Sequence, residues 1–453
     1  MTLNRRQLFT AITAGAATVA AGCRETGSSS TAAKTDNSQP SVRMTNGAVD
    51  WHAVRDLFPL AKDWMHFASF LLVSHPKPVS EAIEHFRQKI DNDPLWIEAA
   101  AFTDSEGRPY AAVKRALAGY AGGLPEEICL TSNTTTALAV AYHGLRIRAD
   151  QEILTTDHEH YSHHESIRFA SVRSGCGIRY VKLYDRAGQA NASQMVEHLE
   201  KALTPKTRAV GVTWVHSSTG VKVPITLIAE AVKRANSGRA SNDRCLLIVD
   251  GVHGFANQDI DVARLGCDFF ASGTHKWLFA PRGTGFLWGA KEVWPELRPT
   301  IPTFDPDAPE PWAAWMDRTA LPPTQASFVS PGGFMTYEHL LAIPAAVELH
   351  KTIGRNNIAA RIRELNQAFR ENARMIPGLT LHTPVDPELS GGISCFELKG
   401  ITPEQIDQKL AEKKIRTNAS PYKVSYARVA AGIMNSPEEV QKVLKEIRTL
   451  AKG

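Results

Sequence analysis

The sequence lacks the features that mark several common classes of protein. Its charges nearly balance, with 51 Lys and Arg against 47 Asp and Glu, and a net charge of +4 excludes the strong basicity typical of nucleic-acid-binding proteins. Its six cysteines form no CxxC pair and show no metal-ligand spacing, so neither a zinc site nor a disulfide framework is indicated. No apolar run reaches the roughly 20 residues that a membrane-spanning helix requires. We therefore expect a globular protein without a nucleic-acid partner or a transmembrane span, in about two or three packing units.

The first residues indicate an export signal. A basic start containing Arg5 and Arg6 leads into an apolar stretch of small residues that ends at Cys23. Paired arginines before a short apolar stretch are typical of the twin-arginine export machinery, which carries folded proteins. We expect residues 1–22 to be a signal peptide and the protein to be periplasmic or exported. Because residues 20–23 (AAGC) resemble a lipoprotein cleavage site, Cys23 is a candidate for lipid anchoring, and the polar residues of 23–50 predict a flexible linker.

Beyond residue 50 the pattern is typical of an α/β protein. Short β-rich runs alternate with segments of helical periodicity, such as 134–145 and 225–236. The alternation predicts a mostly parallel, seven-stranded sheet with helices on both faces. Its strands are expected at 128–131, 153–155, 178–183, 209–213, 246–249, 269–271 and 285–288. In such a sheet the ligand site lies beyond the carboxyl ends of the strands.

The last third of the chain predicts a second, smaller α/β domain. We assign residues 51–340 to a large domain with an N-terminal segment and residues 341–453 to a small C-terminal domain. Within the large domain, the Pro-rich stretch 299–323 is expected to be a long surface connection. Helices are expected at 340–350, at 357–374, and after Thr402 and Ser436, each of which is a cap residue followed by Pro. The apolar runs 393–398 and 424–429 supply its strands.

Two charged residues follow neighbouring strand runs. Asp250 ends the apolar run 246–249, and Lys276 follows the run 269–271. The two residues could form a simple ion pair. Pyridoxal 5′-phosphate (PLP) chemistry, however, needs both groups: a lysine amine to bond the cofactor, and an anion to keep the pyridine nitrogen protonated. Lys276 and Asp250 are therefore candidate catalytic residues of a PLP enzyme whose small-molecule substrate is an amino acid.

A pair of motifs around these residues resembles a known family. Residues 275–288 (HKWLFAPRGTGFLW), preceded by 249–254 (VDGVHG), resemble the class V aminotransferase family of fold-type I PLP enzymes, and within it the isopenicillin N epimerase-like subgroup. The resemblance covers residues 64–445, nearly all of the chain beyond the signal. It implies the fold-type I PLP-dependent transferase fold, with a large sheet domain and a smaller C-terminal α/β domain, and a homodimer.

The resemblance assigns roles to individual residues. Lys276 resembles the lysine that binds the cofactor as a Schiff base, Asp250 the partner of the pyridinium nitrogen, and His253 the side chain that contacts the cofactor's phenolic oxygen. A strand-to-helix turn, where backbone N–H groups favour an anion, resembles the family's phosphate site. The phosphate-binding residues implied in this way are Thr134, Thr135, Ser272 and His275.

The segment 157–164 (DHEHYSHH) is dense in histidine. Several histidines can bind zinc, and this remains one interpretation. The matching family segment supplies an aromatic ring that stacks on the pyridine, and His160 falls at that position. We expect His160 to stack on the cofactor and no metal to be bound, while solvent-facing positions are the alternative for His163 and His164.

The substrate-binding residues include departures from the family pattern. Arg428 resembles the arginine that holds the substrate α-carboxylate in a two-pronged contact, and Arg416 resembles an auxiliary arginine. Trp214 stands where the family has Asn or His, so it either reshapes the substrate pocket or packs in the core. His216 could replace the lost polar contact. Gly333 lacks the hydroxyl that reaches the partner subunit's phosphate in relatives, which puts that contact in doubt.

Several reactions share the same cofactor chemistry. An epimerase or racemase needs proton carriers on both faces of the α-carbon; Lys276 serves one face, and Tyr161 or His216 is a candidate for the other. A carbon–sulfur lyase or an aminotransferase is the alternative on the same scaffold. A cysteine desulfurase is disfavoured because Cys395 lies in an apparent buried strand. An exported binding protein that has lost catalysis is the alternative of another class.

Overall fold

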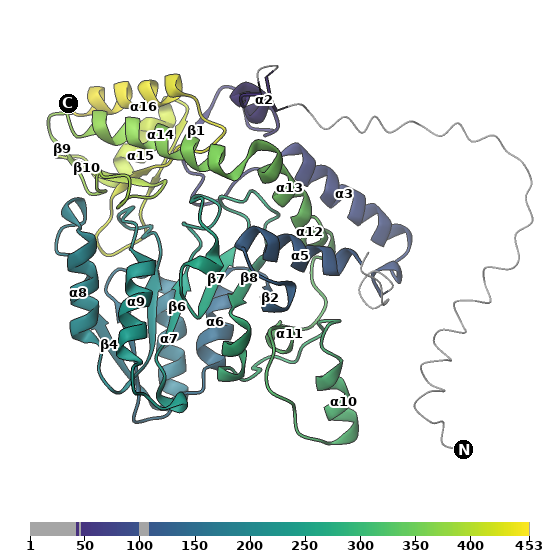
Figure 1. Ribbon diagram of the computed structural model, residues 1–453. Coiled ribbons are helices and arrows are strands. Elements are labelled where there is room, and N and C mark those ends of the chain that lie inside the picture. Colours follow the sequence, from purple (N-terminus) through teal and green to yellow (C-terminus); the bar gives the residue numbers. More distant parts are fainter. Residues whose placement is uncertain (1–41, 45–46, 99–107, 453) are drawn as a thin grey trace, which may run out of the picture. The chain divides into compact units, whose positions relative to one another are not determined.

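The computed structural model describes residues 42–44, 47–98 and 108–452 (Figure 1). The predicted signal peptide, Cys23 and most of the predicted linker lie outside the described residues. Residues Val42–Gly453 belong to one compact unit. The domain boundary placed after residue 340 therefore stays a prediction.

A seven-stranded sheet forms the centre of this unit, as predicted from the alternation. The strand order is β2-β8-β7-β6-β5-β3-β4, and β8 runs in the direction opposite to the other six strands. All seven predicted runs are strands: β2 Ile128–Thr131, β3 Glu152–Thr156, β4 Gly177–Val181, β5 Thr207–Thr213, β6 Leu246–Asp250, β7 Phe269–Gly273 and β8 Gly285–Gly289. The parallel strands end at one edge, which is where Asp250 and Lys276 emerge.

Helices cover both faces of the sheet, because its strands are apolar on both sides. In β6, Leu246 and Ile248 face one core, whereas Leu247 and Val249 face the other, as the period of two requires. The first core contains residues of α6 and α7, and the second contains residues of α5, α8 and α9. These helices are α5 Pro109–Ala121, α6 Thr134–Gly144, α7 Tyr161–Ser174, α8 Ala192–Ala202 and α9 Ile225–Ala235 (Figure 1).

The C-terminal residues form a second, four-stranded antiparallel sheet with its own core. Its order is β12-β13-β10-β9, with β9 Leu379–Leu381, β10 Ser394–Leu398, β12 Asn418–Ala419 and β13 Ala427–Val429. The helices α14 Arg355–Ala373, α15 Pro403–Glu412 and α16 Pro437–Leu450 contribute to this core. Thr402 and Ser436 cap α15 and α16 through capping boxes, as the sequence predicted. The N-terminal strand β1 Met65–His66 pairs in parallel with β11 Ile415–Arg416.

The remaining helices connect these parts, and one of them corrects a prediction. The stretch 299–323, predicted to be a surface connection, contains α10 Pro309–Asp317. Pro is favoured at the first position of a helix, so this Pro-rich composition did not exclude one. The others are α2 Trp51–Asp56, α3 Lys77–Asn92, α11 Ala326–Val329, α12 Tyr337–Leu341 and α13 Ile343–Ile353. Among the described residues, no helix is long and apolar enough to cross a bilayer.

Candidate active site

A cavity of about 290 Å³ opens at the carboxyl ends of the central strands. Residues that directly follow β2, β3, β5, β6 and β7 line it, together with residues of the small sheet's connections. Seven of the predicted site residues meet here: Thr134, Thr135, His160, Asp250, His253, His275 and Lys276. Arg428, from β13, joins them across the sequence.

Lys276 lies in a setting that favours a neutral amine. Its Nζ lies 3.1 Å from Nε2 of His253, and the side chain is within the cavity lining. Burial lowers the pKa of Lys276 to about 8, against the opposing effect of the Asp250 carboxylate. Burial and the neighbouring Lys276 both lower the pKa of His253 well below its usual value. The neutral amine, which is thus more abundant near neutral pH than in an ordinary lysine, is the form that attacks a carbonyl.

Asp250 is a buried carboxylate that lacks a cation. It is 3% exposed and accepts a hydrogen bond from the backbone N–H of Val252 at 3.1 Å. Burial raises the pKa of Asp250, and nearby His163 acts in the opposite direction. No ion pair of Asp250 exists among the described residues, so a protonated ring nitrogen placed here would neutralise it.

The start of α6 forms an anion site. The Asn133 side chain caps the helix by accepting from the N–H of Thr136, which leaves the N–H groups of Thr134 and Thr135 for a ligand. Thr134 Oγ1 accepts from the N–H of Gly273 at 2.7 Å, which ties the helix start to the strand that precedes Lys276. Nδ1 of His275 is buried without a hydrogen-bond partner in the described structure. A phosphate group fits this set of donors.

A second group of side chains lines the cavity from the β3–α7 loop and the small sheet. His160 caps α7, with Nδ1 accepting from the N–H of Ser162, and its ring packs edge-on against Tyr422 with centroids 6.1 Å apart. The hydroxyl of Tyr422 lies 2.6 Å from Oγ of Ser217. Arg428 donates to the carbonyl of Ser217 at 3.0 Å and to Asn418, and its guanidinium lies over the ring of Phe70. Arg428 has no ion-pair partner among the described residues, so it can bind a carboxylate.

A buried polar network lies behind the cavity. Glu159 contacts His163 Nδ1 at 2.9 Å and hydrogen-bonds Thr156 and Thr213. Burial alone would raise the pKa of Glu159, but His163, His216 and the hydrogen bond from Thr156 lower it to about 2. His163 is fully buried, so the solvent-facing position considered for it is wrong. The histidines of this segment have other partners: within the described residues no group of three or more His, Cys, Asp or Glu could hold a metal ion.

Four predicted site residues do not line this cavity. Ser272 donates to the carbonyl of Gly273, and Arg416 lies over the ring of Trp64 at 3.8 Å. Trp214 is 3% exposed within the core, where its ring packs against Phe270. His216 is fully buried and bonds the hydroxyl of Tyr184 at 2.9 Å. Their proposed roles stay predictions, and the structure places none of them at the cavity.

Sequence reasoning missed His158, Ser217 and Tyr422, which line the cavity. Ser217 follows β5, so its place after a strand could have marked it. Tyr422 lies in the connection between β12 and β13, just before the arginine strand. A loop residue of this kind has no local pattern, and only the packing of the small sheet onto the large one brings it to Lys276.

The fold and the site together define a class of protein. An α/β fold with a lysine of lowered pKa, a buried carboxylate and a helix start with free N–H groups matches the charge pattern of PLP: an aldehyde, a protonated pyridine and a phosphate.

Comparison with known proteins agrees with this class. The family model described as Aminotransferase class-V matches residues 74–443. The chain belongs to this family, which confirms the resemblance, the enzyme class and the cofactor PLP. An isopenicillin N epimerase of Streptomyces clavuligerus is 30% identical over 293 residues, or 63% of this chain and 69% of that protein. A probable cysteine desulfurase of Halalkalibacterium halodurans is 24% identical, over 78% of this chain and 84% of that protein.

Solved structures show the same fold. A complex of the cystine C–S lyase C-DES with its product cysteine persulfide has a TM-score of 0.74 at 21% identity, covering 86% of this chain and 99% of that one. The apo structure of a cysteine desulfurase from Thermococcus onnurineus has a TM-score of 0.73 at 19% identity, covering 89% and 98%. These likenesses confirm the predicted fold.

Proposed function

We propose that this enzyme is an epimerase or racemase that inverts the α-carbon of an amino acid. The observation that carries the proposal is that two side chains able to carry a proton, the Lys276 amine and the Tyr422 hydroxyl, belong to two separate groups of residues around one small cavity. The 30% identity to an isopenicillin N epimerase supports it.

The two groups of residues are connected internally but not to each other. Lys276 bonds His253, whereas Tyr422 contacts Ser217 and His160. No hydrogen bond or ion pair joins one group to the other among the described residues, although both line a cavity of about 290 Å³. Both groups therefore line one cavity without being bonded to each other, and we propose that Lys276 and Tyr422 approach the substrate's α-carbon from opposite faces.

The protonation states of Lys276 and Tyr422 suit removal of the α-proton by Lys276 and donation of a proton by Tyr422. When bound, PLP withdraws electrons from the α-carbon and so acidifies its proton. Lys276, with a pKa near 8, accepts a proton once its amine is free. Burial raises the pKa of Tyr422 to about 12, so its hydroxyl holds a proton to donate at neutral pH. Arg428 fixes the α-carboxylate, and Ser217 orients the Tyr422 hydroxyl.

The test measures two rates in deuterated water: inversion of the α-carbon and exchange of the α-proton for deuterium. With Tyr422→Phe we expect inversion to fall by about 10²-fold or more, because one proton carrier is lost. Exchange should persist for the enantiomer whose proton faces Lys276, and the visible absorbance of the bound cofactor should be retained. Tyr161→Phe is the matched control: Tyr161 is 73% exposed and does not line the cavity, so both rates should stay at the wild-type level.

Two results would contradict this proposal. Inversion at the wild-type rate in Tyr422→Phe would place the second proton carrier elsewhere. Exchange without inversion in the wild type, with release of a keto acid or a thiol, would favour the aminotransferase or carbon–sulfur lyase alternative. The lyase alternative gains support from the C-DES likeness and needs only Lys276 as a proton carrier.

Desulfuration is not favoured by the positions of the cysteines. All five cysteines among the described residues are buried, and none lines the cavity. Cys395 lies in β10, as predicted, and burial raises the pKa of its thiol to about 12. A persulfide-forming cysteine needs an accessible thiolate near the substrate.

We also propose export through the twin-arginine route, with Cys23 as the point of lipid attachment. Arg5 and Arg6 before the short apolar stretch support the route. Replacing both by lysine should leave the protein in the cytoplasm in a fractionation assay, whereas Arg24→Lys should not. Cys23→Ser should move the exported protein from the membrane fraction to the soluble fraction. The proposal is contradicted if the variant with both Arg5 and Arg6 replaced, or Cys23→Ser, is distributed between the fractions as the wild type is.

We propose a homodimer on the basis of exposed apolar residues. Phe334 is 88% exposed, and Leu71 and Leu72, beside the cavity, are more than half exposed. Large apolar side chains exposed to this extent are often found at interaction surfaces. Sedimentation of the purified enzyme should give the mass of two chains, and a monomer at micromolar concentration would contradict this.

A further inference from the structure

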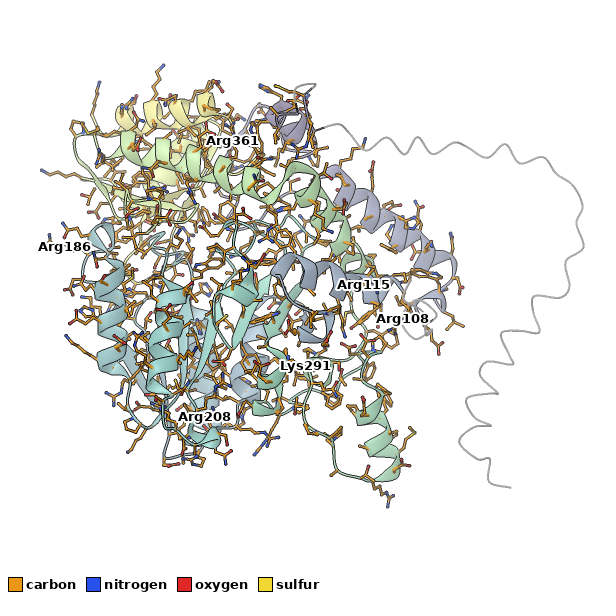
Figure 2. All side chains as sticks on the ribbon, viewed as in Figure 1. Arg108, Arg115, Arg186, Arg208, Lys291 and Arg361 are labelled. Atoms are coloured by element: carbon orange, nitrogen blue, oxygen red, sulfur yellow. The ribbon has the colours of Figure 1, made fainter. Side chains whose placement is uncertain are left out.

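A cavity of about 530 Å³ lies at the opposite end of the large sheet from Lys276. Its lining includes Gln151, which precedes β3, and Arg208, near the start of β5. Residues 142–148 and Ser174, where α6 and α7 end, also line it. Figure 2 shows Arg208 in the lower part of the molecule, away from α15 and α16 at the top.

This cavity is separate from the one that contains Lys276. Thr134, at the start of α6, lines the cavity with Lys276, whereas Gly144, at the end of α6, lines the other. A helix of 11 residues spans about 16 Å, so the two cavities lie at opposite ends of α6.

Arginine dominates the charged residues of this second lining, which we call the arginine cavity. Its described lining contains five arginines: Arg146, Arg148, Arg173, Arg208 and Arg298. Glu296 is the one carboxylate among these lining residues, and it pairs with Arg208. Two further carboxylates, Asp150 and Asp243, pair with Arg148 from outside the lining. Arginines outnumber all of these carboxylates, so the cavity is positively charged.

Three of the arginines have no carboxylate partner among the described residues. They are Arg146, which follows α6, Arg173 in the last turn of α7, and Arg298, which follows the 3₁₀ helix Lys291–Glu296. Nε of Arg146 donates to the carbonyl of Pro295, and Arg173 donates to the carbonyl of His143. The side chain of Arg298 has no hydrogen-bond partner in the described part of the chain. Guanidinium donors from three segments are therefore available to a ligand.

The ring of His143 adds an unpaired polar atom to this lining. His143 lines the cavity, and its Nε2 is buried without a hydrogen-bond partner in the described structure. Burial and the neighbouring Arg173 lower the pKa of His143, so the neutral ring predominates near pH 7. Buried polar atoms are nearly always bonded in proteins, so this nitrogen is a point at which a ligand can bond.

Guanidinium groups on several sides suit a ligand with several anionic groups. A guanidinium binds phosphate oxygens through paired N–H donors. Linked phosphates carry charged oxygens along their whole length, so one such chain can contact arginines of several segments at once. The volume of about 530 Å³ lies within the range of about 300–1,000 Å³ that is typical of small-molecule sites.

We infer that the arginine cavity binds a small anion with two or more linked phosphate groups, either free or as part of a nucleotide. Arg146, Arg173 and Arg298 contact the phosphates, and Arg208 forms the buried base of the site. The site is independent of the reaction at Lys276, so the inference does not depend on the proposed function.

Isothermal titration calorimetry of the PLP-loaded enzyme measures this binding, because the cofactor then occupies its own phosphate site. We expect inorganic triphosphate to bind at least about tenfold more tightly than inorganic phosphate, since it contacts more guanidinium groups. The double variant Arg146→Gln, Arg298→Gln should weaken triphosphate binding by about tenfold or more. Its melting temperature and cofactor absorbance should match those of the wild type. ATP that binds as tightly as triphosphate supports a nucleotide ligand, and ATP that binds more weakly supports a free phosphate chain.

Two controls test where the anion binds. Arg115 on α5 (Figure 2) and Arg448 on α16 are exposed and line neither cavity, so their double replacement by Gln should leave the Kd within about twofold. Arg428→Gln, in the cavity with Lys276, should also leave it unchanged. A loss of triphosphate binding in Arg428→Gln would place the anion at the substrate site and overturn the inference.

Two further results would overturn it. One is equal binding of triphosphate and phosphate to the wild type, and the other is wild-type affinity in the Arg146 and Arg298 variant. If that variant does not fold, Arg298→Gln alone decides, because this side chain bonds no described residue. We expect the single variant to fold as the wild type does and to weaken triphosphate binding by about threefold or more. An unchanged Kd would overturn the inference.

Discussion

The two groups of residues around the cavity differ in how they are built. The group with Asp250, His253 and Lys276 comes from consecutive strand ends of one sheet, where the positions are fixed by the strand ladder. In the other group, His160 and Ser217 also follow strands of the large sheet, whereas Tyr422 and Arg428 come from the small sheet and its loops and reach the cavity only through packing of one sheet on the other. We expect the first group to determine whether the cofactor is attached, and Tyr422 and Arg428 to determine which substrate is bound and how it reacts. The following predictions separate these two roles.

The largest effect is expected for Lys276→Ala. The loss of the amine removes both the covalent attachment of the cofactor and a proton carrier, so turnover should fall by about 10³-fold or more. The visible absorbance that borohydride bleaches in the wild type should disappear. A variant that keeps this absorbance would show that another amine holds the cofactor.

A smaller effect is expected for Arg428→Gln, which should weaken substrate binding without affecting the cofactor. Loss of a charged two-pronged contact costs about 1.5–3 kcal/mol, which corresponds to about 10- to 100-fold in KM. The cofactor spectrum should not change, because Arg428 belongs to the other group of residues. A variant that fails to load the cofactor would show that the two groups are not separable.

The pH dependence of cofactor loading tests the environment of Lys276. Burial lowers the folded-state pKa of Lys276, so the neutral amine is the major form above about pH 8 and is protonated below it. The rate of PLP binding to the apoprotein should rise by about tenfold from pH 7 to pH 9 and then level off. Stopped-flow absorbance measures this rate, and a continued rise to pH 10 would indicate an unperturbed lysine.

The smallest effect is expected for Arg416→Gln. The Arg416 side chain is exposed over Trp64 and does not line the cavity, so kcat and KM should stay within about twofold of the wild type. Loss of the cation–π contact should lower the free energy of unfolding by about 0.5–1 kcal/mol. A change in KM similar to that of Arg428→Gln would show that Arg416 is a substrate-binding residue after all.

The sequence predicted the strand-end residues well because their patterns are local. An apolar strand that ends in Asp250, and a helix cap at Asn133 before Thr134, can each be recognised in a short stretch of sequence. Tyr422 could not be found in this way, since it lies in a loop and reaches Lys276 only through tertiary packing. His216 and Trp214 follow a strand as expected, but their side chains are buried away from the cavity. Position along the chain predicted the strand ends, but not where each side chain points.

The pairing of β1 with β11 has a consequence for synthesis and export. Met65 and His66 are made early, but their partners Ile415 and Arg416 are among the last 40 residues of the 453-residue chain. The backbone of this N-terminal segment therefore cannot complete its hydrogen bonds during most of translation. We expect the nascent chain to acquire its final form, and to retain vitamin B6 aldehyde, only after release from the ribosome. Export of the folded protein with its cofactor bound would suit such a chain better than export in the unfolded state.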